Sequence, residues 1–111
     1  MITIHRDSEL VTLINSFSCE PTKQDDLINA WQQATEAELG GLPGIVSAAL
    51  HRSLDGTRVV NYAQWRGADD WRNLTRVGTM KKYFERTARF GKPDAHLYKV
   101  VYVLDNTASP S

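Results

Sequence analysis

The order of strand-like and helix-like segments leaves this chain few folds to adopt. Segments rich in β-branched and aromatic residues, which are typical of strands, cover residues 9–19, 45–52, 58–65 and 96–105. Apolar residues spaced three and four apart predict helices at 21–40 and 68–90. The resulting order, β-α-β-β-α-β, is the split βαβ pattern of a ferredoxin-like α+β fold. In this fold the strands form one antiparallel sheet, and both helices cover one of its faces.

Turn and breaker residues mark where these segments end. Pro21 suits the first turn of a helix, where its missing N–H leaves no hydrogen bond unmade. Gly40-Gly41 predicts the end of that helix, and Asp55-Gly56 between two strand-like runs is a strong hairpin signal. Gly78 interrupts the second helical region, so two shorter helices are also possible there.

The 111 residues suit a single domain. We expect residues 1–8 to form a flexible N-terminal arm, residues 9–105 the domain, and residues 106–111 a disordered tail. The fourth strand carries Val, Tyr and Leu at both alternating positions, which is typical of a strand buried on two sides. Because a chain this short has nothing left to cover the second face of its sheet, we predict a homodimer through the sheets, a dimeric α+β barrel.

Charge and cysteine content exclude several classes of function. Thirteen basic residues balance thirteen acidic ones, so no net field attracts nucleic acid or a membrane surface. The single cysteine, Cys19, cannot form an intramolecular disulfide or by itself a structural zinc site. No signal peptide is visible, and no apolar stretch reaches the roughly 18 residues of a membrane span. We therefore expect a cytoplasmic protein with no nucleic-acid or membrane partner.

The common catalytic and cofactor-binding motifs are absent from the sequence. It contains no Gly-rich phosphate loop, no histidine pair at metal-binding spacing, no Gly-x-Ser-x-Gly and no flavin or nicotinamide fingerprint. The three histidines, His5, His51 and His96, stand far apart, so no metal site is predicted. If the chain is an enzyme, we expect it to work without a bound organic cofactor or to use the reactivity of its substrate.

Polar residues inside the predicted strands are the best candidates for a site, because a buried amide needs partners. Strand alternation places Asn61 on the same face as Trp65. If the strand registers agree, Asn15 and His51 line one cavity with Asn61 and Trp65, and small side chains nearby leave room for a ligand.

The same residues also have purely structural explanations. Asn15 could satisfy a nearby backbone group, and His51 could be exposed beside the hairpin. Trp65 could be core filler, and Trp71 lies on a helical stripe that favours core packing. Tyr83 could line the mouth of a pocket or belong to the core. Arg86, with the other arginines of its region, is expected in solvent, although one of them could stabilise an anionic substrate.

The second and third strands resemble those of a known enzyme family. Residues 55–65, Asp-Gly-Thr-Arg-Val-Val-Asn-Tyr-Ala-Gln-Trp, are similar to the hallmark third-strand segment of the antibiotic biosynthesis monooxygenases. Residues 42–51 resemble the second strand of that family, where the Pro-Gly pair is less specific. The similarity runs from about residue 12 to residue 105 and is strongest to the actinorhodin-type and anthrone-oxidising, quinone-forming enzymes.

This resemblance implies a dimeric barrel that oxidises a phenolic or anthrone-type aromatic polyketide to a quinone. Molecular oxygen is the co-substrate, and no metal, flavin or nicotinamide is required. Residue by residue, the catalytic positions of the family fall on Asn61, Trp65 and His51. The substrate-binding candidates are Asn15, Trp71, Tyr83 and Arg86, of which Tyr83 and Arg86 are stand-ins for a tyrosine and an arginine of the family.

The implied mechanism starts from an electron-rich substrate anion. The anion gives one electron to oxygen, the radical pair collapses to a peroxide, and loss of water leaves the quinone. Asn61 would hydrogen-bond a substrate oxygen or the peroxide, and Trp65 would stack on the ring. His51, whose unperturbed pKa of about 6.5 lies near working pH, would accept the proton.

Three other functions are compatible with this fold, because a fold does not determine an activity. Haem degradation would need a histidine on the second helix, and residues 68–90 contain none. A polyketide cyclase or isomerase would use the same pocket without oxygen. A non-catalytic ligand-binding module would bind without turnover, so oxygen uptake with a model anthrone separates these functions.

Overall fold

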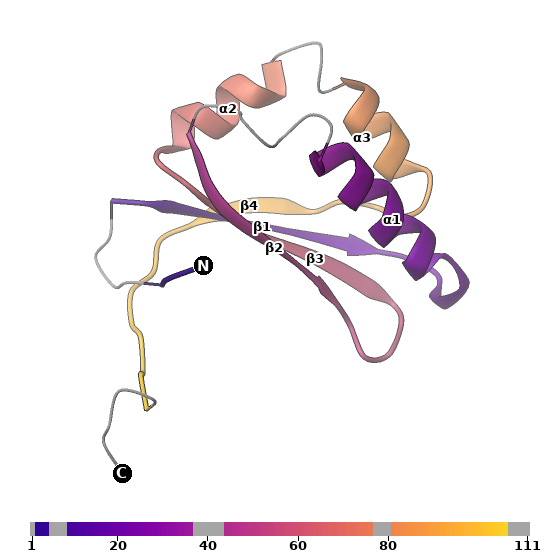
Figure 1. Ribbon diagram of the computed structural model, residues 1–111, viewed down its shortest axis with the longest axis horizontal. Helices are drawn as coiled ribbons and strands as arrows, with labels where there is room; N and C mark the ends of the chain where they lie inside the picture. The colour runs from indigo at the N-terminus through magenta and orange to yellow at the C-terminus, as the bar shows by residue number, and fades with distance from the viewer. Residues whose placement is uncertain (1, 5–8, 37–43, 77–80, 107–111) are drawn as a thin grey trace.

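The computed structural model describes residues 2–4, 9–36, 44–76 and 81–106, with only the backbone at 74–76 and 81–83 (Figure 1). Its elements follow the predicted order, and the second helical region forms two helices. They are β1 (Val11–Ser18), the short 3-10 helix η1 (Pro21–Lys23), α1 (Gln24–Ala34), β2 (Ile45–Arg52), β3 (Arg58–Trp65), α2 (Ala68–Arg76), α3 (Lys81–Ala88) and β4 (Ala95–Tyr98). The predicted helix breakers Gly40-Gly41 and Gly78 lie outside the described residues.

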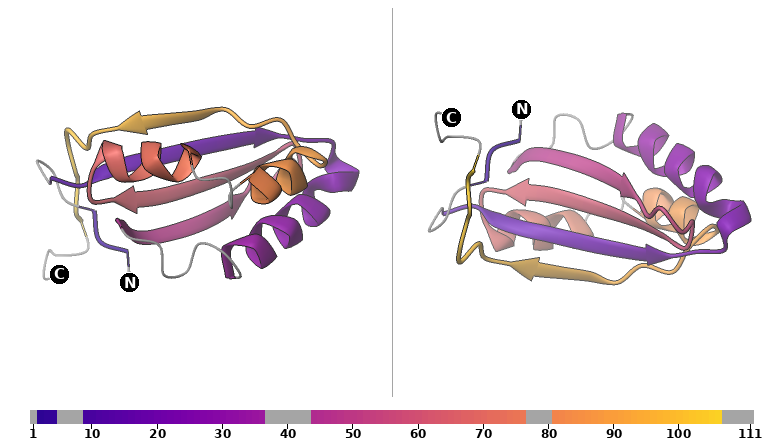
Figure 2. Two further views of the ribbon diagram at one scale, coloured as in Figure 1. Left: turned by 90° about the horizontal axis from the view of Figure 1, so that it is seen from above. Right: turned by 90° about the horizontal axis from the view of Figure 1, so that it is seen from below.

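The four strands form one antiparallel sheet in the order β2-β3-β1-β4. All three α-helices lie on one face of this sheet, as the views from above and below show (Figure 2). Between the helices and the sheet lies the hydrophobic core. Its buried members are Leu13, Phe17, Leu27, Trp31, Ala34, Val59, Ala63 and Trp65. The predicted ferredoxin-like α+β fold is therefore confirmed.

Helix α1 follows from its sequence pattern. Leu27, Trp31 and Ala34 recur at helical spacing and are all buried against the sheet. Asp25 and Asp26 stand in the first turn, where negative charge interacts favourably with the helix dipole. Pro21 begins the 3-10 turn that leads into the helix, so its missing N–H costs no helical hydrogen bond.

The hairpin between β2 and β3 forms at the predicted Asp55-Gly56 pair. Gly56 has a φ of +82°, which a residue with a side chain rarely adopts. One carboxylate oxygen of Asp55 accepts hydrogen bonds from the Thr57 hydroxyl at 2.6 Å, the Thr57 backbone N–H at 3.0 Å and the Ser53 hydroxyl at 2.8 Å. These bonds, those from Thr57 first, lower the pKa of Asp55 to about 2.

The fourth strand is shorter than predicted, and this part of the prediction is wrong. Strand β4 covers only Ala95–Tyr98, where Tyr98 pairs with Thr12 near the start of β1. Beyond that point β1 offers almost no backbone for pairing, so residues 99–106 leave the sheet on the side away from the helices (Figure 1). Val101, Tyr102 and Leu104 are 76%, 70% and 70% exposed. Within one chain, this segment is therefore not buried on two sides.

The N-terminal residues 2–4 also lie on the side of the sheet away from the helices (Figure 1). The backbone carbonyl of Thr3 accepts a hydrogen bond of 2.7 Å from the Gln64 side chain, a contact that the sequence did not predict. The rest of the predicted arm and residues 107–111 of the predicted tail lie outside the described residues. In the part of the chain that the structure describes, no helix has the length and apolar character to cross a bilayer.

Candidate functional site

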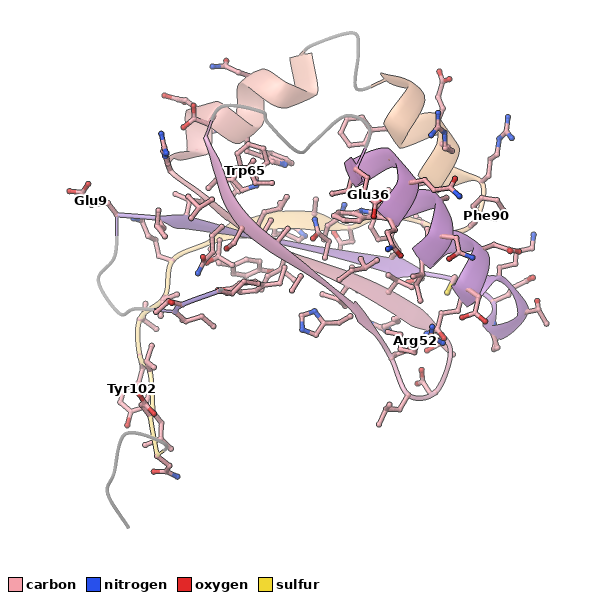
Figure 3. The ribbon with its side chains drawn as sticks, viewed as in Figure 1. Glu9, Glu36, Arg52, Trp65, Phe90 and Tyr102 are labelled. Atoms are coloured by element: carbon pink, nitrogen blue, oxygen red, sulfur yellow. The ribbon has the colours of Figure 1, made fainter. Side chains whose placement is uncertain are left out.

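Asn61 and Trp65 lie on the helix-facing side of β3, as strand alternation predicted. They share this face with the buried core residues Val59 and Ala63, and they are themselves only 6% and 2% exposed. Figure 3 shows Trp65 between the sheet and α2. The strand thus carries an amide and an indole into the layer between sheet and helices.

Each of these two side chains holds a buried polar atom without a hydrogen-bond partner among the described residues. In Asn61 the atom is Oδ1, a hydrogen-bond acceptor, and in Trp65 it is Nε1, whose N–H is a donor. An unpaired buried polar group costs about 1–3 kcal/mol, so native proteins keep few of them. The two atoms are therefore the part of the core most suited to a ligand that presents a donor and an acceptor.

Aromatic side chains of α1 and α2 pack in or against the same core as Trp65. Trp31 of α1 is buried in the core, as its helical stripe predicted. Trp71 of α2 is half-buried and packs against the same core, so its predicted place on a packed helical face is confirmed. Among the described residues, none of the buried side chains carries a charge. The site is an apolar, aromatic environment in which hydrogen bonds are strengthened by the low dielectric.

Asn15 lies directly opposite Asn61 in the pairing of β1 with β3. Its Oδ1 accepts a hydrogen bond of 3.2 Å from the backbone N–H of Asp94. The Asn15 oxygen thus satisfies a nearby backbone group, which is the structural alternative given above, and it holds the segment before β4. Asn15 borders the site, and its part in binding substrate stays a prediction.

The prediction that His51 lines the same cavity as Asn61 is wrong. Strand β2 contains a bulge, since Ile45 pairs with Trp65 and Ser47 already pairs with Gln64. The extra residue, Val46, shifts the alternation, so His51 faces the opposite side of the sheet, where it pairs with Val60 and is exposed.

The other half of β2 confirms this shift of alternation. Arg52, the neighbour of His51, lies on the helix side, and its guanidinium is 2.9 Å from the Asp25 carboxylate of α1 (Figure 3). Leu50, which we did not predict at this position, lies opposite Asn61 and packs against the core. The sequence carries no local signal for the bulge, so Leu50 was missed.

The remaining candidates are on the second helical region. The side chain of Tyr83 lies outside the described residues. Arg86 lies in the last turn of α3 and is exposed, as we predicted for the arginines of this region. Its part in binding substrate stays a prediction. Within the described ranges, no group of three or more His, Cys, Asp or Glu side chains could hold a metal ion.

Comparison with known proteins places the chain in a family. The family model for antibiotic biosynthesis monooxygenases matches residues 10–86, which include the whole of β3. The chain belongs to the antibiotic biosynthesis monooxygenase family. The predicted family and enzyme class are therefore confirmed.

The chain is similar in sequence or in fold to several known proteins. It is 35% identical over 108 residues to the tetracenomycin-F1 monooxygenase of Streptomyces glaucescens, covering 97% of this chain and 96% of the relative. The monooxygenase from the gene ActVA-Orf6 of Streptomyces coelicolor, solved with nanaomycin D, is 25% identical with a TM-score of 0.78 and covers 87% of this chain and 92% of its own. SnoaB, a cofactor-independent oxygenase from Streptomyces nogalater, shares the fold: its structure is 19% identical with a TM-score of 0.69 and covers 87% of this chain and 98% of its own.

Proposed function

We propose that this chain is a cofactor-independent monooxygenase that oxidises a phenolic or anthrone-type aromatic polyketide to a quinone with molecular oxygen. The observation that carries the proposal is a pair of buried atoms on β3, Asn61 Oδ1 and Trp65 Nε1, that have no hydrogen-bond partner in the described part of the chain. Relatives that act on tetracenomycin F1 or bind nanaomycin D support the substrate class, and the cofactor-independent SnoaB supports the absence of a cofactor.

The two atoms suit the two kinds of oxygen that such a substrate carries. Asn61 Oδ1 accepts a hydrogen bond from a phenolic O–H, and the indole N–H of Trp65 donates one to a carbonyl oxygen. As the substrate loses a proton, negative charge grows on its oxygens. A donor held in an apolar layer stabilises that charge more than water would, so Trp65 favours the anion.

The oxidation itself needs no redox group of the protein. The substrate anion passes one electron to oxygen, and the resulting radical pair forms a carbon–oxygen bond. The peroxide then loses water, so one oxygen atom stays in the new carbonyl group and the other leaves in water. His51, the predicted proton acceptor, has no place in this scheme because it lies on the opposite face of the sheet.

Oxygen consumption tests the proposal directly. Purified protein treated with a chelator is given dithranol, a simple anthrone, and we expect uptake of one oxygen molecule for each quinone formed. Trp65→Phe removes the hydrogen bond donated to the developing charge, and removal of such a donor costs about 100-fold in kcat in other enzymes. Asn61→Ala removes the acceptor for the phenolic O–H, and we expect it to lower the rate of oxygen uptake as well. A matched control, Leu54→Ser, changes a side chain at the tip of the hairpin that is fully exposed.

If dithranol binds but the protein consumes oxygen no faster than the uncatalysed reaction does, the proposal is contradicted. Binding is followed in the same samples by the rise in melting temperature with ligand. Binding without uptake would instead favour a polyketide cyclase, an isomerase or a ligand-binding module on the same fold.

We also propose that the chain forms a homodimer through the sheet face that the helices leave uncovered. Ile14, Val60 and Tyr62 lie half-buried on this face, and the hydroxyl of Tyr62 is buried without a partner among the described residues. The exposed apolar side chains of residues 101–104 lie on the same side of the sheet. A second copy on this face would cover both groups of apolar side chains.

A further inference from the structure

Gln64 is a buried amide on the face of β3 opposite to the site. It is 5% exposed and directly precedes Trp65, so its side chain points to the uncovered face while Trp65 points to the helices. Both ends of the amide are paired by short hydrogen bonds. Oε1 accepts from the Ser47 hydroxyl at 2.6 Å, and Nε2 donates to the backbone carbonyl of Thr3 at 2.7 Å.

The hydrogen bond to Ser47 joins Gln64 to the bulge in β2. Ser47 is the first residue after the extra residue Val46, where the register changes, and bulges disrupt the regular ladder of backbone hydrogen bonds. Just before the bulge, Ile45 lies opposite Trp65 and packs against the core. The position of the bulge therefore determines which β2 side chain borders the indole.

The hydrogen bond to Thr3 attaches the N-terminal residues 2–4 to Gln64. The N-terminal residues 2–4 lie across the uncovered side of the sheet at the end of β3 that carries Trp65. Just after Trp65, the backbone N–H of Arg66 donates to the carbonyl of Gly44 at 2.8 Å, which holds the start of β2 against the end of β3. The Gln64 side chain thus joins two other segments, the β2 bulge and the N-terminal residues 2–4, to β3 at the position before Trp65.

We propose that Gln64 is a positioning residue that sets the orientation of the Trp65 indole from the opposite face of the sheet. It does so by holding the β2 bulge through Ser47 and the N-terminal segment through Thr3. The use of the indole in catalysis rests on the proposed function, whereas its placement by Gln64 does not. Small displacements of a group that acts on the reacting atoms reduce the rate, by up to about 100-fold for a shift of 1 Å.

Two variants and a control test this role. Gln64→Met keeps the length of the side chain and removes both hydrogen bonds, and Ser47→Ala removes only the bond to the bulge. Gln33→Met makes the same chemical change on the exposed surface of α1 and serves as control. The readouts are the ¹⁵N–¹H resonance of the Trp65 indole, assigned with Trp31→Phe and Trp71→Phe variants, and kcat and KM for dithranol oxidation.

In both variants we expect the Trp65 indole resonance to move while that of Trp31 stays in place. We expect kcat to fall roughly 10- to 100-fold with little change in KM, because binding is retained and alignment is lost. The control should match the unaltered protein in both readouts.

Unaltered Trp65 resonances and kcat in a folded variant would overturn the proposal, even if the melting temperature falls, because Gln64 would then only stabilise the fold. If Gln64→Met does not fold, the Trp65 resonance and kcat of Ser47→Ala alone test the proposal. If the unaltered protein shows no oxygen uptake, the proposed function fails, and the Trp65 resonance still decides whether Gln64 positions the indole.

Discussion

Asn61 carries a buried polar atom that costs the fold stability. Its Oδ1 lies in the apolar layer with no donor from the described residues, while the opposite residue, Asn15, has its oxygen paired with the Asp94 N–H. Two asparagines on adjacent strands therefore differ in what their amides do. An apolar side chain of similar size at position 61 would remove an unpaired group, whereas the same change at position 15 would break a bond.

We therefore predict that Asn61→Leu raises the free energy of unfolding by about 1 kcal/mol and abolishes most of the oxygen uptake. Asn15→Leu is the matched control, and it should lower stability because the Asp94 N–H loses its partner. Urea unfolding of the three proteins measures the difference. Destabilisation by Asn61→Leu equal to that of Asn15→Leu would mean that the Asn61 amide is a structural group.

At the scale of the elements, alternation and turn signals predicted most of the structure. Strands β2 and β3 begin and end at the predicted residues, and the Asp-Gly pair between them is a strong local signal for a hairpin. The predicted fourth strand failed beyond Tyr98, because a strand needs a partner and β1 begins at Val11. His51 was misplaced because a bulge depends on contacts across the sheet, such as that of Gln64, which a linear pattern does not contain.

The hairpin between β2 and β3 gives a prediction about pH. The hydrogen bonds from Thr57 and Ser53 lower the pKa of Asp55 from 3.8 to about 2 in the folded protein. A carboxylate with a lowered pKa stabilises the fold fully above its unfolded value, and this contribution is lost as the pH falls from about 4 through 2. Asp55→Asn keeps an acceptor oxygen and removes the charge.

We expect the unaltered protein to be more stable than Asp55→Asn at neutral pH and the difference to shrink towards zero near pH 2. Thermal unfolding of both proteins between pH 7 and pH 2 measures it. Glu9→Gln, which neutralises an exposed carboxylate outside the helices, is the control. A difference between the two proteins that does not vary with pH would rule out the contribution of the Asp55 charge.

At the scale of the whole molecule, the two faces of the sheet carry different groups of residues. The helix-facing side holds the core and the unpaired atoms of Asn61 and Trp65. The other side holds the Gln64 contacts, the N-terminal residues 2–4 and the exposed apolar C-terminal segment. Gln64 and Trp65 are neighbours on β3, and their side chains lie on opposite faces of the sheet. A partner that covers the face with Gln64 would therefore contact the residue next to Trp65.

The proposed homodimer would provide that cover. We predict that the protein sediments with twice the mass of one chain, and that Val101→Asp with Leu104→Asp shifts it towards the monomer, because two charges would be buried against a second copy. Leu54→Asp places a charge on a fully exposed leucine at the hairpin and should leave the dimer intact. Analytical ultracentrifugation over a range of concentrations measures the mass. A monomer at every concentration would refute the dimer, and a dimer unaffected by the paired aspartates would place its interface away from the C-terminal segment.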